Sequence, residues 1–458
     1  MNMKNNVILL VTIVILLIGK TSNAQDSFIY NSSSDDEVCH LALMIPLYLE
    51  QVDEEFCEET PNNKMLLTKP FSFLHFYEGF MIAVDSMVNS RGMKLDLKVY
   101  DVDNDVNKAL AAIGDPWIAE ADVIVGPFYI KPFEKVKEYA NQNNILIVNP
   151  ITQRSNIVEN HPKVVKVKPS LESQVIYLES LIKKHYHSNN VFIVGRDGLV
   201  DDEMMVQIND VVENNIDEVS YVDNSHIVNV IKRHQKRWSM LEVDFDESDF
   251  LTDNVSLNIE MLKRNINDST SFKNYIVNIN YSRDSLHNVK KYASLLRNNL
   301  FIVYGNDKIF ADEVVNKLTK LTEYYPITVV MLPEWSKFDR LFNENLMKMK
   351  AIYFDDNFID YQSVKVLSFV NKFRAKYGSE PQKQAFQGFD IGWYFLNACK
   401  YYGADVEDVL QYFSVPLLQS EFHFRKNGEN DGYENVFWNV YQFRDYDKIP
   451  IELKITTE

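Results

Sequence analysis

Short apolar runs alternate with amphipathic segments along most of the chain. The clearest example is two runs rich in β-branched residues, 122–126 and 145–148, each followed by proline within two residues. Between them apolar residues recur at helical spacing, and Pro132 suits a first helical turn, where its missing N–H needs no partner. Two buried strands joined by an amphipathic helix predict a βαβ unit with a right-handed crossover.

The same alternation extends over both halves of the sequence and predicts an α/β fold of two Rossmann-like, doubly wound lobes. The chain of 458 residues is also too long for one core. Further strands are expected at 38–47, 95–100, 164–169, 191–195, 275–279, 300–304, 327–332 and 351–354, with helices at 71–89, 108–113, 172–186, 201–214, 285–297, 308–321, 362–377 and 384–402.

The lobes are expected to exchange chain segments through a multi-strand hinge. Segments 164–169 and 351–360 are interpreted as an outward and a return crossing, so the helices after 360 should pack with the first lobe. We therefore expect 38–168 plus 357–412 in the first lobe and 169–356 plus 413–458 in the second. The polar segment 223–271 is interpreted as strand, loop and helix elaboration of the second lobe.

The first 24 residues have the pattern of a cleaved signal peptide. Lys4 precedes twelve apolar or neutral residues, and Ser22-Asn23-Ala24 fits a small-x-small cleavage site. Twelve residues are short for a membrane span, which needs about twenty. No cysteine follows closely, since Cys39 is fifteen residues past the expected cut. We expect a polar spacer at 25–37 and a periplasmic protein that carries no lipid and does not span the membrane after cleavage.

The charge balance argues against nucleic acid as a partner. The net charge is −18, and loss of Lys4 and Lys20 with the leader makes it −20. Phosphate backbones require clustered lysine and arginine. The basic run 232–237 is the exception, and we interpret it as a solvated loop or helix face.

The three cysteines are too few for a disulfide framework. Pairing of Cys39 with Cys57 is left open, because the chain between Pro46 and Cys57 would have to run back along the whole first strand. Cys399 lies in an apolar segment and is interpreted as a small buried hydrophobe.

The sequence contains no recognisable catalytic signature: H-E-x-x-H, G-x-S-x-G, a Walker loop and G-x-G-x-x-G are all missing. His185 and His187 would point to different sides of a helix, which disfavours a shared metal. The acids in 101–105 lack the glycine and glutamate of a calcium loop, so they are interpreted as a strand-to-loop turn. We expect no enzymatic activity, no cofactor and no metal.

Loops at the carboxyl ends of the strands are the expected ligand site, because ligands of open α/β sheets gather there. Two such rims facing each other would supply aromatic walls, hydroxyls, an arginine and carboxylates for a small polar molecule. Loop chemistry alone also explains Asn, Asp, Gly and Pro at such positions. The candidate ligand-binding residues are Phe128, Tyr129, Asn149, Thr152, Arg196, Asp197, Asp307 and Trp335.

Six motifs follow one another along the chain: Phe76–Asp85, Val125-Gly126-Pro127, Asn149-Pro150, Val164–Ser170, Glu380-Pro381 and Ala385–Asp390. In this order they resemble the type I periplasmic binding proteins, the group that contains branched-chain amino-acid-binding proteins. More narrowly, Leu332–Trp335 and Phe424–Asn435 resemble the binding-protein-like region of Bacteroidetes LysM-containing proteins, although no LysM repeat is visible.

This resemblance implies two lobes joined by three crossings, with a ligand held in the cleft as in a Venus flytrap. It implies a solute-binding protein for an amino-acid-like ligand and an ABC transporter permease as partner. Amino-acid binders usually have small hydroxyl residues on the first-lobe loops, whereas this chain has Phe128-Tyr129 and the loop 149–154 there. The alternative is the same fold used for envelope interaction or sensing, which the acidic insertions 50–69 and 223–271 favour slightly.

Overall fold

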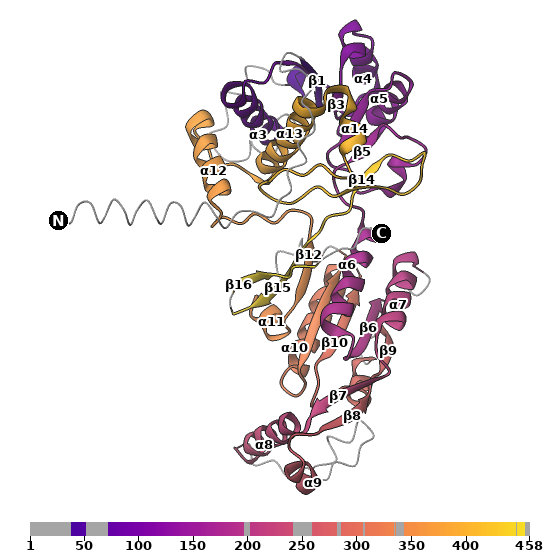
Figure 1. Ribbon diagram of the computed structural model, residues 1–458, viewed down its shortest axis with the longest axis vertical. Coiled ribbons are helices and arrows are strands. Elements are labelled where there is room, and N and C mark those ends of the chain that lie inside the picture. Colours follow the sequence, from indigo (N-terminus) through magenta and orange to yellow (C-terminus); the bar gives the residue numbers. More distant parts are fainter. Residues whose placement is uncertain are drawn as a thin grey trace, which may run out of the picture.

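The computed structural model consists of two lobes, one above the other in Figure 1. It describes residues 38–51, 72–196, 202–240, 259–281, 285–305, 307–333, 335, 343–445 and 447–453. The expected signal peptide, the polar spacer and Cys57 lie outside these ranges. Within them, no helix is both long and apolar enough to cross a membrane.

The first lobe is built on a seven-stranded sheet that is parallel except at one edge. Its order is β13-β14-β5-β4-β3-β1-β2, and only the β13–β14 pair is antiparallel. The expected βαβ unit is present as β3, α5 and β4, with β2 at the other edge of the sheet. The strands are β1 (Cys39–Ile45), β2 (Leu95–Asp101), β3 (Val123–Val125), β4 (Leu146–Asn149), β5 (Val164–Lys166), β13 (Phe424–Lys426) and β14 (Tyr433–Asn435).

Helices cover both faces of this sheet because β1 is apolar on both sides. Leu41 and Leu43 pack toward α3 and α13, whereas Ala42 and Met44 pack toward α4 and α5. The helices are α3 (Leu74–Asp85), which continues as a π-helical turn η4 (Ser86–Ser90), and α4 (Val106–Ile113), α5 (Ile130–Gln142), α12 (Val364–Tyr377), α13 (Lys383–Tyr402) and α14 (Val406–Val409).

The second lobe repeats this design with the order β16-β15-β12-β11-β10-β6-β9. Its strands are β6 (Asn190–Arg196), β9 (Ile276–Tyr281), β10 (Asn299–Tyr304), β11 (Ile327–Leu332), β12 (Ile352–Asp355), β15 (Asn439–Arg444) and β16 (Asp447–Pro450). One face packs on α6 (Gln174–Leu181) and α7 (Glu203–Asn215), and the other on α10 (Lys308–Leu321), α11 (Asn343–Lys348) and the 3-10 helix η10 (Ser285–Lys291). The sequence predicted a helix over 285–297. The structure has the shorter 3-10 helix η10 there, so both the predicted helix type and its length were wrong.

The segment 223–271, which was hardest to interpret, contributes to a small distal unit on the second lobe. The strands β7 (Val219–Asp223) and β8 (Ser269–Lys273) pair antiparallel, and α8 (Asn224–Met240) and α9 (Ile259–Arg264) lie beside them (Figure 1). The basic run 232–237 lies on α8, where every side chain of the run except that of His234 is exposed.

Helices α3 and α13, about three hundred residues apart in sequence, pack closely enough for their backbones to touch. A Cβ at Gly79 would lie 1.8 Å from the carbonyl oxygen of Ala385, and one at Gly388 would lie 2.0 Å from that of Phe76. Helix α12 completes this layer, because its Phe369 and Phe373 pack with Ile82 of α3. The two motifs 76–85 and 385–390 therefore form the contact that returns the chain to the first lobe.

Three connections join the lobes, and the third corrects the expected assignment of 413–458 to the second lobe. The chain passes from β5 to α6, from β12 to α12 and from β14 to β15. Strands β13 and β14 belong to the first sheet, since β14 pairs in parallel with β5. Only β15 and β16 lie in the second sheet. The apolar pattern of a strand does not reveal which distant strand it pairs with.

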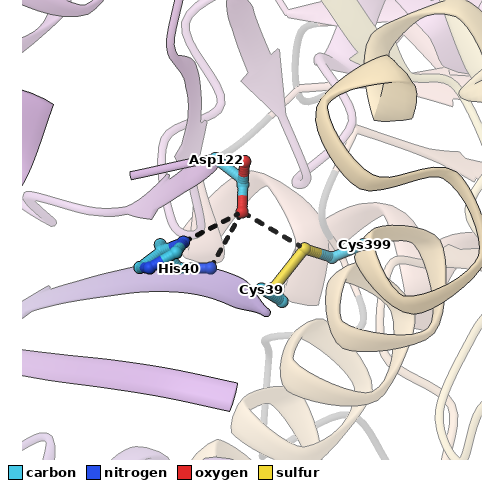
Figure 2. The surroundings of a disulfide bond; sticks show 4 residues. All are labelled: Cys39, His40, Asp122 and Cys399. Carbon is cyan, nitrogen blue, oxygen red and sulfur yellow. Dashed lines mark hydrogen bonds and ion pairs between the residues drawn. A yellow bond between two sulfur atoms is a disulfide. The ribbon is translucent and has the colours of Figure 1, made fainter. Parts of the chain in front are cut away.

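A disulfide links Cys39 at the start of β1 to Cys399 on α13, with Cα atoms 6.1 Å apart (Figure 2). The Asp122 carboxylate lies beside it, 3.9 Å from Cys399 Sγ, and accepts the His40 backbone N–H at 2.8 Å. The interpretation of Cys399 as an unpaired buried hydrophobe was therefore wrong, and Cys39 is not available to Cys57. Because both sulfur atoms are in the disulfide, they are not metal ligands.

Candidate functional site

The carboxyl ends of the two sheets face each other across the hinge. Lys168 follows β5 of the first sheet, Asp356 follows β12 of the second, and their side chains form an ion pair at 3.1 Å. Strands β1 to β5 run parallel in one sheet, and β6, β9, β10, β11 and β12 run parallel in the other. Each set of strand ends therefore lies at the edge nearest the other lobe, where open α/β sheets bind ligands.

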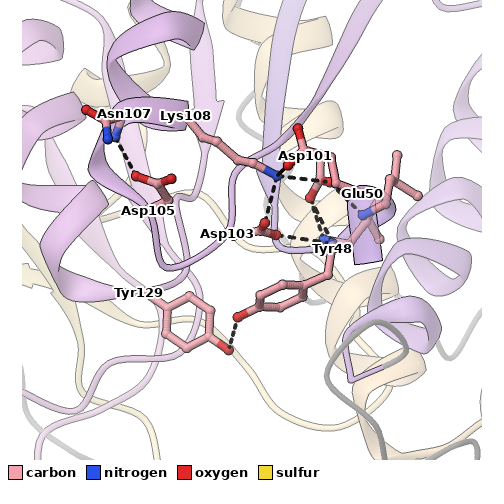
Figure 3. A network of polar contacts seen from close by, with 10 residues as sticks. Tyr48, Glu50, Asp101, Asp103, Asp105, Asn107, Lys108 and Tyr129 are labelled. Atoms are coloured by element: carbon pink, nitrogen blue, oxygen red, sulfur yellow. Dashed lines mark hydrogen bonds and ion pairs between the residues drawn. The ribbon is translucent and has the colours of Figure 1, made fainter. Parts of the chain in front are cut away.

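On the first lobe, two tyrosines from different loops meet at this edge. The Tyr48 hydroxyl, after β1, lies 3.2 Å from the Tyr129 hydroxyl, after β3 (Figure 3). Burial, and then the contact with Tyr129, raises the pKa of Tyr48 well above its usual range. The Tyr48 hydroxyl therefore stays protonated, and a tyrosine hydroxyl can donate or accept a hydrogen bond.

The loop that carries Tyr48 is held by the acidic turn after β2. The Asp101 carboxylate accepts the backbone N–H groups of Leu47, Tyr48 and Leu49 at 2.8, 3.0 and 2.8 Å. Tyr48 has a positive φ of 54°, which is uncommon for a side chain of this size. The acids that superficially resembled a calcium loop thus fix the backbone under Tyr48.

Lys108 neutralises part of this acidic turn. Its Nζ lies 2.7 Å from Asp103 and 3.8 Å from Asp101 (Figure 3). Burial raises the pKa of Asp103, an effect that Asp101 reinforces and Lys108 opposes. Partial burial alone would lower the pKa of Lys108, but its hydrogen bonds with Asp103 and Glu50 raise it. The turn is internally paired, which suits a support for Tyr48.

Glycine is required where β3 ends. Gly126 has φ +97°, and a Cβ there would lie 2.1 Å from the Met44 carbonyl oxygen. This close approach brings the loop 127–129 next to the loop after β1. Tyr129 then starts α5 as its N-cap residue, without a side-chain hydrogen bond to the helix.

Phe128 does not form the wall expected of it. Its ring is 1 % exposed and packs edge-on against Phe73 and Phe76 in the core of the first lobe. Tyr129 also packs edge-on against Phe73, but its hydroxyl reaches the rim, where it meets that of Tyr48. Both residues are aromatic, so the sequence pattern could not show which of the two would be buried.

Asn149 and Thr152 build the loop after β4. The buried Asn149 side-chain oxygen accepts the N–H groups of Ile151 and Thr152 at 3.1 and 2.9 Å, and its amide nitrogen lies 3.5 Å from the Pro127 carbonyl. The side chain of Asn149 is therefore occupied in shaping the rim. Thr152, 8 % exposed, accepts the N–H of Arg154.

On the second lobe, Arg196 and Asp307 come together at the ends of β6 and β10. Arg196 Nη1 lies 3.2 Å from Asp307, and the two side chains are 53 % and 33 % exposed. Asp307 caps α10 by accepting the Phe310 N–H at 2.9 Å. That hydrogen bond, and then Arg196, lowers the pKa of Asp307. The pair offers a cation and an anion to the space between the lobes.

The remaining two candidates of the second lobe have different outcomes. Trp335 is 1 % exposed, and its indole N–H donates to the Gly305 carbonyl at 2.6 Å. It packs on Phe310 in the core, so its expected place in the cleft was wrong. Asp197 lies outside the described residues.

Tyr48 and Tyr304 were missed, although the rule that selected the other rim residues applies to both. Tyr48 follows the first strand, and Tyr304 is the last residue of β10, with its hydroxyl 2.7 Å from Asp202. Burial, and then Asp202, raises the pKa of Tyr304 above its usual range. Their position at strand ends was the available signal.

The sequence matches no known family profile and no curated protein. Solved structures do resemble the fold. A protein of Rhodospirillum rubrum assigned to branched-chain amino acid ABC transport is 11 % identical, with 91 % of this chain and 100 % of that chain covered and a TM-score of 0.50.

Two further structures are similar at lower TM-scores. The ABC transporter substrate-binding protein of Desulfitobacterium hafniense in complex with leucine is 12 % identical. The match covers 91 % of this chain and 100 % of that chain, with a TM-score of 0.46. Full-length LpoA of Haemophilus influenzae is 12 % identical. The match covers 92 % of this chain and 60 % of that chain, with a TM-score of 0.47. At such identities the likeness concerns the fold alone: two α/β lobes of the periplasmic binding protein type I architecture, as the sequence predicted.

Proposed function

We propose that this chain is an exported solute-binding protein that holds a small polar, amino-acid-like ligand between its lobes without chemical conversion. The observation that carries the proposal is the Lys168–Asp356 ion pair, because it sets the two polar rims opposite each other. The likeness in fold to the Rhodospirillum rubrum protein, which is assigned to branched-chain amino acid ABC transport, supports the same role.

The chemistry of the rims suits a ligand with two different ends. Arg196 would donate hydrogen bonds to an anionic group such as a carboxylate, and Asp307 would bind a cationic or hydroxyl-bearing end. Tyr129 and Thr152 would contact the ligand from the first lobe, with Tyr48 as an additional hydroxyl. Closure would exclude water, so each polar contact would strengthen as the local dielectric constant falls.

Export through cleavage near Gln25 belongs to this proposal, as does the absence of lipid. The Cys39–Cys399 disulfide supports an oxidising compartment such as the periplasm. The partner would be an ABC permease that receives the ligand. Mass analysis of the native N-terminus tests the export step, and retention of 1–24 in a membrane fraction would contradict it.

Calorimetric titration with amino acids, short peptides and sugars tests the ligand site. Tyr129→Ala and Arg196→Ala should each weaken the tightest ligand by about 1–3 kcal/mol, as expected for a polar partner lost from a closed site. Tyr221→Ala and Arg444→Ala are matched controls, because both residues are exposed and lie on β7 and β15. Tight binding that neither rim substitution weakens would place the site elsewhere.

The alternative function is an envelope interaction or sensory protein with the same fold. The distal unit of β7, α8, α9 and β8 favours it, since a unit so far from the hinge contributes nothing to a ligand between the lobes (Figure 1). Native mass spectrometry of the purified protein distinguishes the two: a bound small molecule supports solute binding, and a stoichiometric protein partner supports the alternative.

A further inference from the structure

A second concave surface lies on the first lobe, away from the rims described above. It is a groove of about 660 Å³ between α12, α13 and the segment 413–418, and none of the candidate rim residues lines it. We call it the α12–α13 groove. Its chemistry differs from that of the rims, because aromatic and aliphatic side chains form most of its surface.

The floor of the groove is an aromatic stripe along α13. Phe389, Trp393, Asn397 and Tyr401 recur every fourth residue and therefore share one helix face. The rings of Phe389 and Trp393 stack with centroids 5.7 Å apart and planes 12° apart. Both rings rest on the core yet remain partly exposed. A solvated helix face is normally polar, so this stripe points to an apolar occupant.

Helix α12 and the loop after α14 provide the walls. Val364 on α12 is 81 % exposed although it is apolar, and Tyr401 on the facing helix is 46 % exposed. Val415 and Leu418 close the other side. The Leu418 N–H is held at 2.7 Å by the buried Asp390 carboxylate, which fixes this wall to α13.

All charged residues that line the groove are cations: Arg91, Lys365 and Lys372. This local balance is opposite to that of the whole chain, whose net charge is −18. The Arg91 guanidinium lies 4.5 Å from the centroid of the Trp393 ring and donates to Asn397 at 2.7 Å. Lys365 and Lys372 are two helical turns apart on α12, about 10 Å along its axis. An apolar floor with a cationic rim complements an amphipathic anion.

We propose that the α12–α13 groove binds a small amphipathic anion, a carboxylate on an apolar body such as a medium-chain fatty acid. The apolar body lies on Phe389 and Trp393, where burial of apolar surface supplies most of the affinity. The carboxylate is held by the Arg91 guanidinium or by a lysine of α12. This site is independent of the polar site between the lobes.

Titration of the full-length mature protein with dodecanoate, below its micelle concentration, tests the proposal. Dodecanoate should bind and change the fluorescence of Trp393, whereas dodecylamine, of equal chain length and opposite charge, should bind at least about tenfold more weakly. Trp393→Phe should remove the fluorescence change but keep the calorimetric binding, because the aromatic floor is retained.

Two groove variants and one control locate the binding. Lys365→Glu combined with Lys372→Glu should weaken dodecanoate roughly tenfold or more. Ser368→Trp, at an exposed position lining the groove, should block it sterically even if charge reversal disturbs α12. Lys232→Glu, exposed on α8 in the other lobe, should leave binding unchanged.

Equal binding of dodecylamine, or dodecanoate binding that neither groove variant weakens, would overturn the proposal. The polar-solute titrations should be unaffected by Trp393→Phe, by the double lysine variant and by Ser368→Trp. An experiment that overturns the groove proposal can therefore be distinguished from one that overturns the proposed interlobe site.

Discussion

Cys39 and Cys399 are bonded to each other across 360 residues of sequence. The bond ties the first strand of the first lobe to α13, a helix that the chain reaches only after it has built most of the second lobe (Figure 2). It therefore closes a covalent loop that contains most of the described fold, all but α14 and the strands β13 to β16. In the unfolded chain such a loop restricts the accessible conformations, and longer loops restrict them more.

Cys399→Ser should lower the free energy of unfolding by about 2–5 kcal/mol, because it releases this loop. Urea denaturation with and without reductant measures the effect. Reductant should destabilise the wild-type protein and leave the variant unchanged. Titration of denatured protein should find one free thiol in the wild type, Cys57, and two in the variant. A wild-type protein whose peptide map joins Cys39 to Cys57 would contradict the pairing.

Gly388→Ala should be strongly destabilising, although alanine normally favours a helix over glycine. The added Cβ would lie 2.0 Å from the Phe76 carbonyl oxygen, a backbone atom that moves only if α3 and α13 separate. We expect a loss of about 2 kcal/mol or more, the upper range for overpacking. Thermal unfolding measures it.

Gly114→Ala is the matched control for that substitution. Gly114 follows α4 with an ordinary φ of −78°, and a Cβ there would lie 3.3 Å from the nearest atom. It should change stability by less than about 1 kcal/mol. If both substitutions cost the same, the backbone contact between α3 and α13 is not what limits residue 388.

The contact between α3 and α13 illustrates what the sequence could and could not predict. Helical spacing placed both helices, and the strand-like crossings suggested that α13 returns to the first lobe. Neither pattern could show that Cys39 meets Cys399, because one strand and one helix can pack in many registers. The assignment of β13 and β14 failed for the same reason, since their pairing with β5 is long-range.

The candidate site was predictable to the level of loops. The rule that ligands gather at carboxyl ends of parallel strands selected Tyr129, Arg196 and Asp307, which do lie at those ends. It also selected Phe128 and Trp335, which are buried. The direction of a loop side chain depends on the local backbone conformation, which the sequence pattern does not show. An apolar residue of such a loop can therefore pack into the core as readily as it can contact a ligand.

Asp390 should make the protein less stable as the pH rises from about 4 to about 7. Burial raises the pKa of this carboxyl to about 7 in the folded state, despite hydrogen bonds from Leu418 and Gln419, whereas about 3.9 is usual in an unfolded chain. In that interval the unfolded state releases the proton and the folded state keeps it, so folding becomes less favourable. Above pH 7 both states are ionised and this effect is complete.

Asp390→Asn should flatten this pH dependence, because the amide does not titrate. At pH 5 the variant should be less stable than the wild type, since its amide nitrogen cannot accept the N–H that Asp390 accepts from Leu418 or Gln419. At pH 8 the difference should shrink or reverse. Urea titrations at several pH values measure both curves, and parallel curves would show that Asp390 does not ionise in this range.

Lys166 and Glu434 form a buried ion pair at the base of the hinge, and breaking it should cost far more than breaking an exposed pair. Lys166 Nζ lies 2.9 Å from Glu434, and their side chains are 0 % and 4 % exposed. Burial lowers the pKa of Lys166, and Glu434 opposes that shift. Lys166→Met would leave the carboxylate with only the donors of Ser170, among them its N–H at 2.8 Å. An uncompensated buried charge costs about 3–5 kcal/mol.

Two further variants separate the cost of a buried unpaired charge from the loss of the ion-pair attraction itself. Lys183→Met removes an exposed pair with Glu179 and should cost less than about 1 kcal/mol. Lys166→Met combined with Glu434→Gln should recover much of the stability lost in Lys166→Met, because no charge is then left buried. Denaturant unfolding of the wild type, Lys166→Met, Glu434→Gln and the double variant gives the coupling energy of the pair directly. If Lys166→Met costs no more than Lys183→Met, water reaches Glu434 and the pair does not fix β5 to β14.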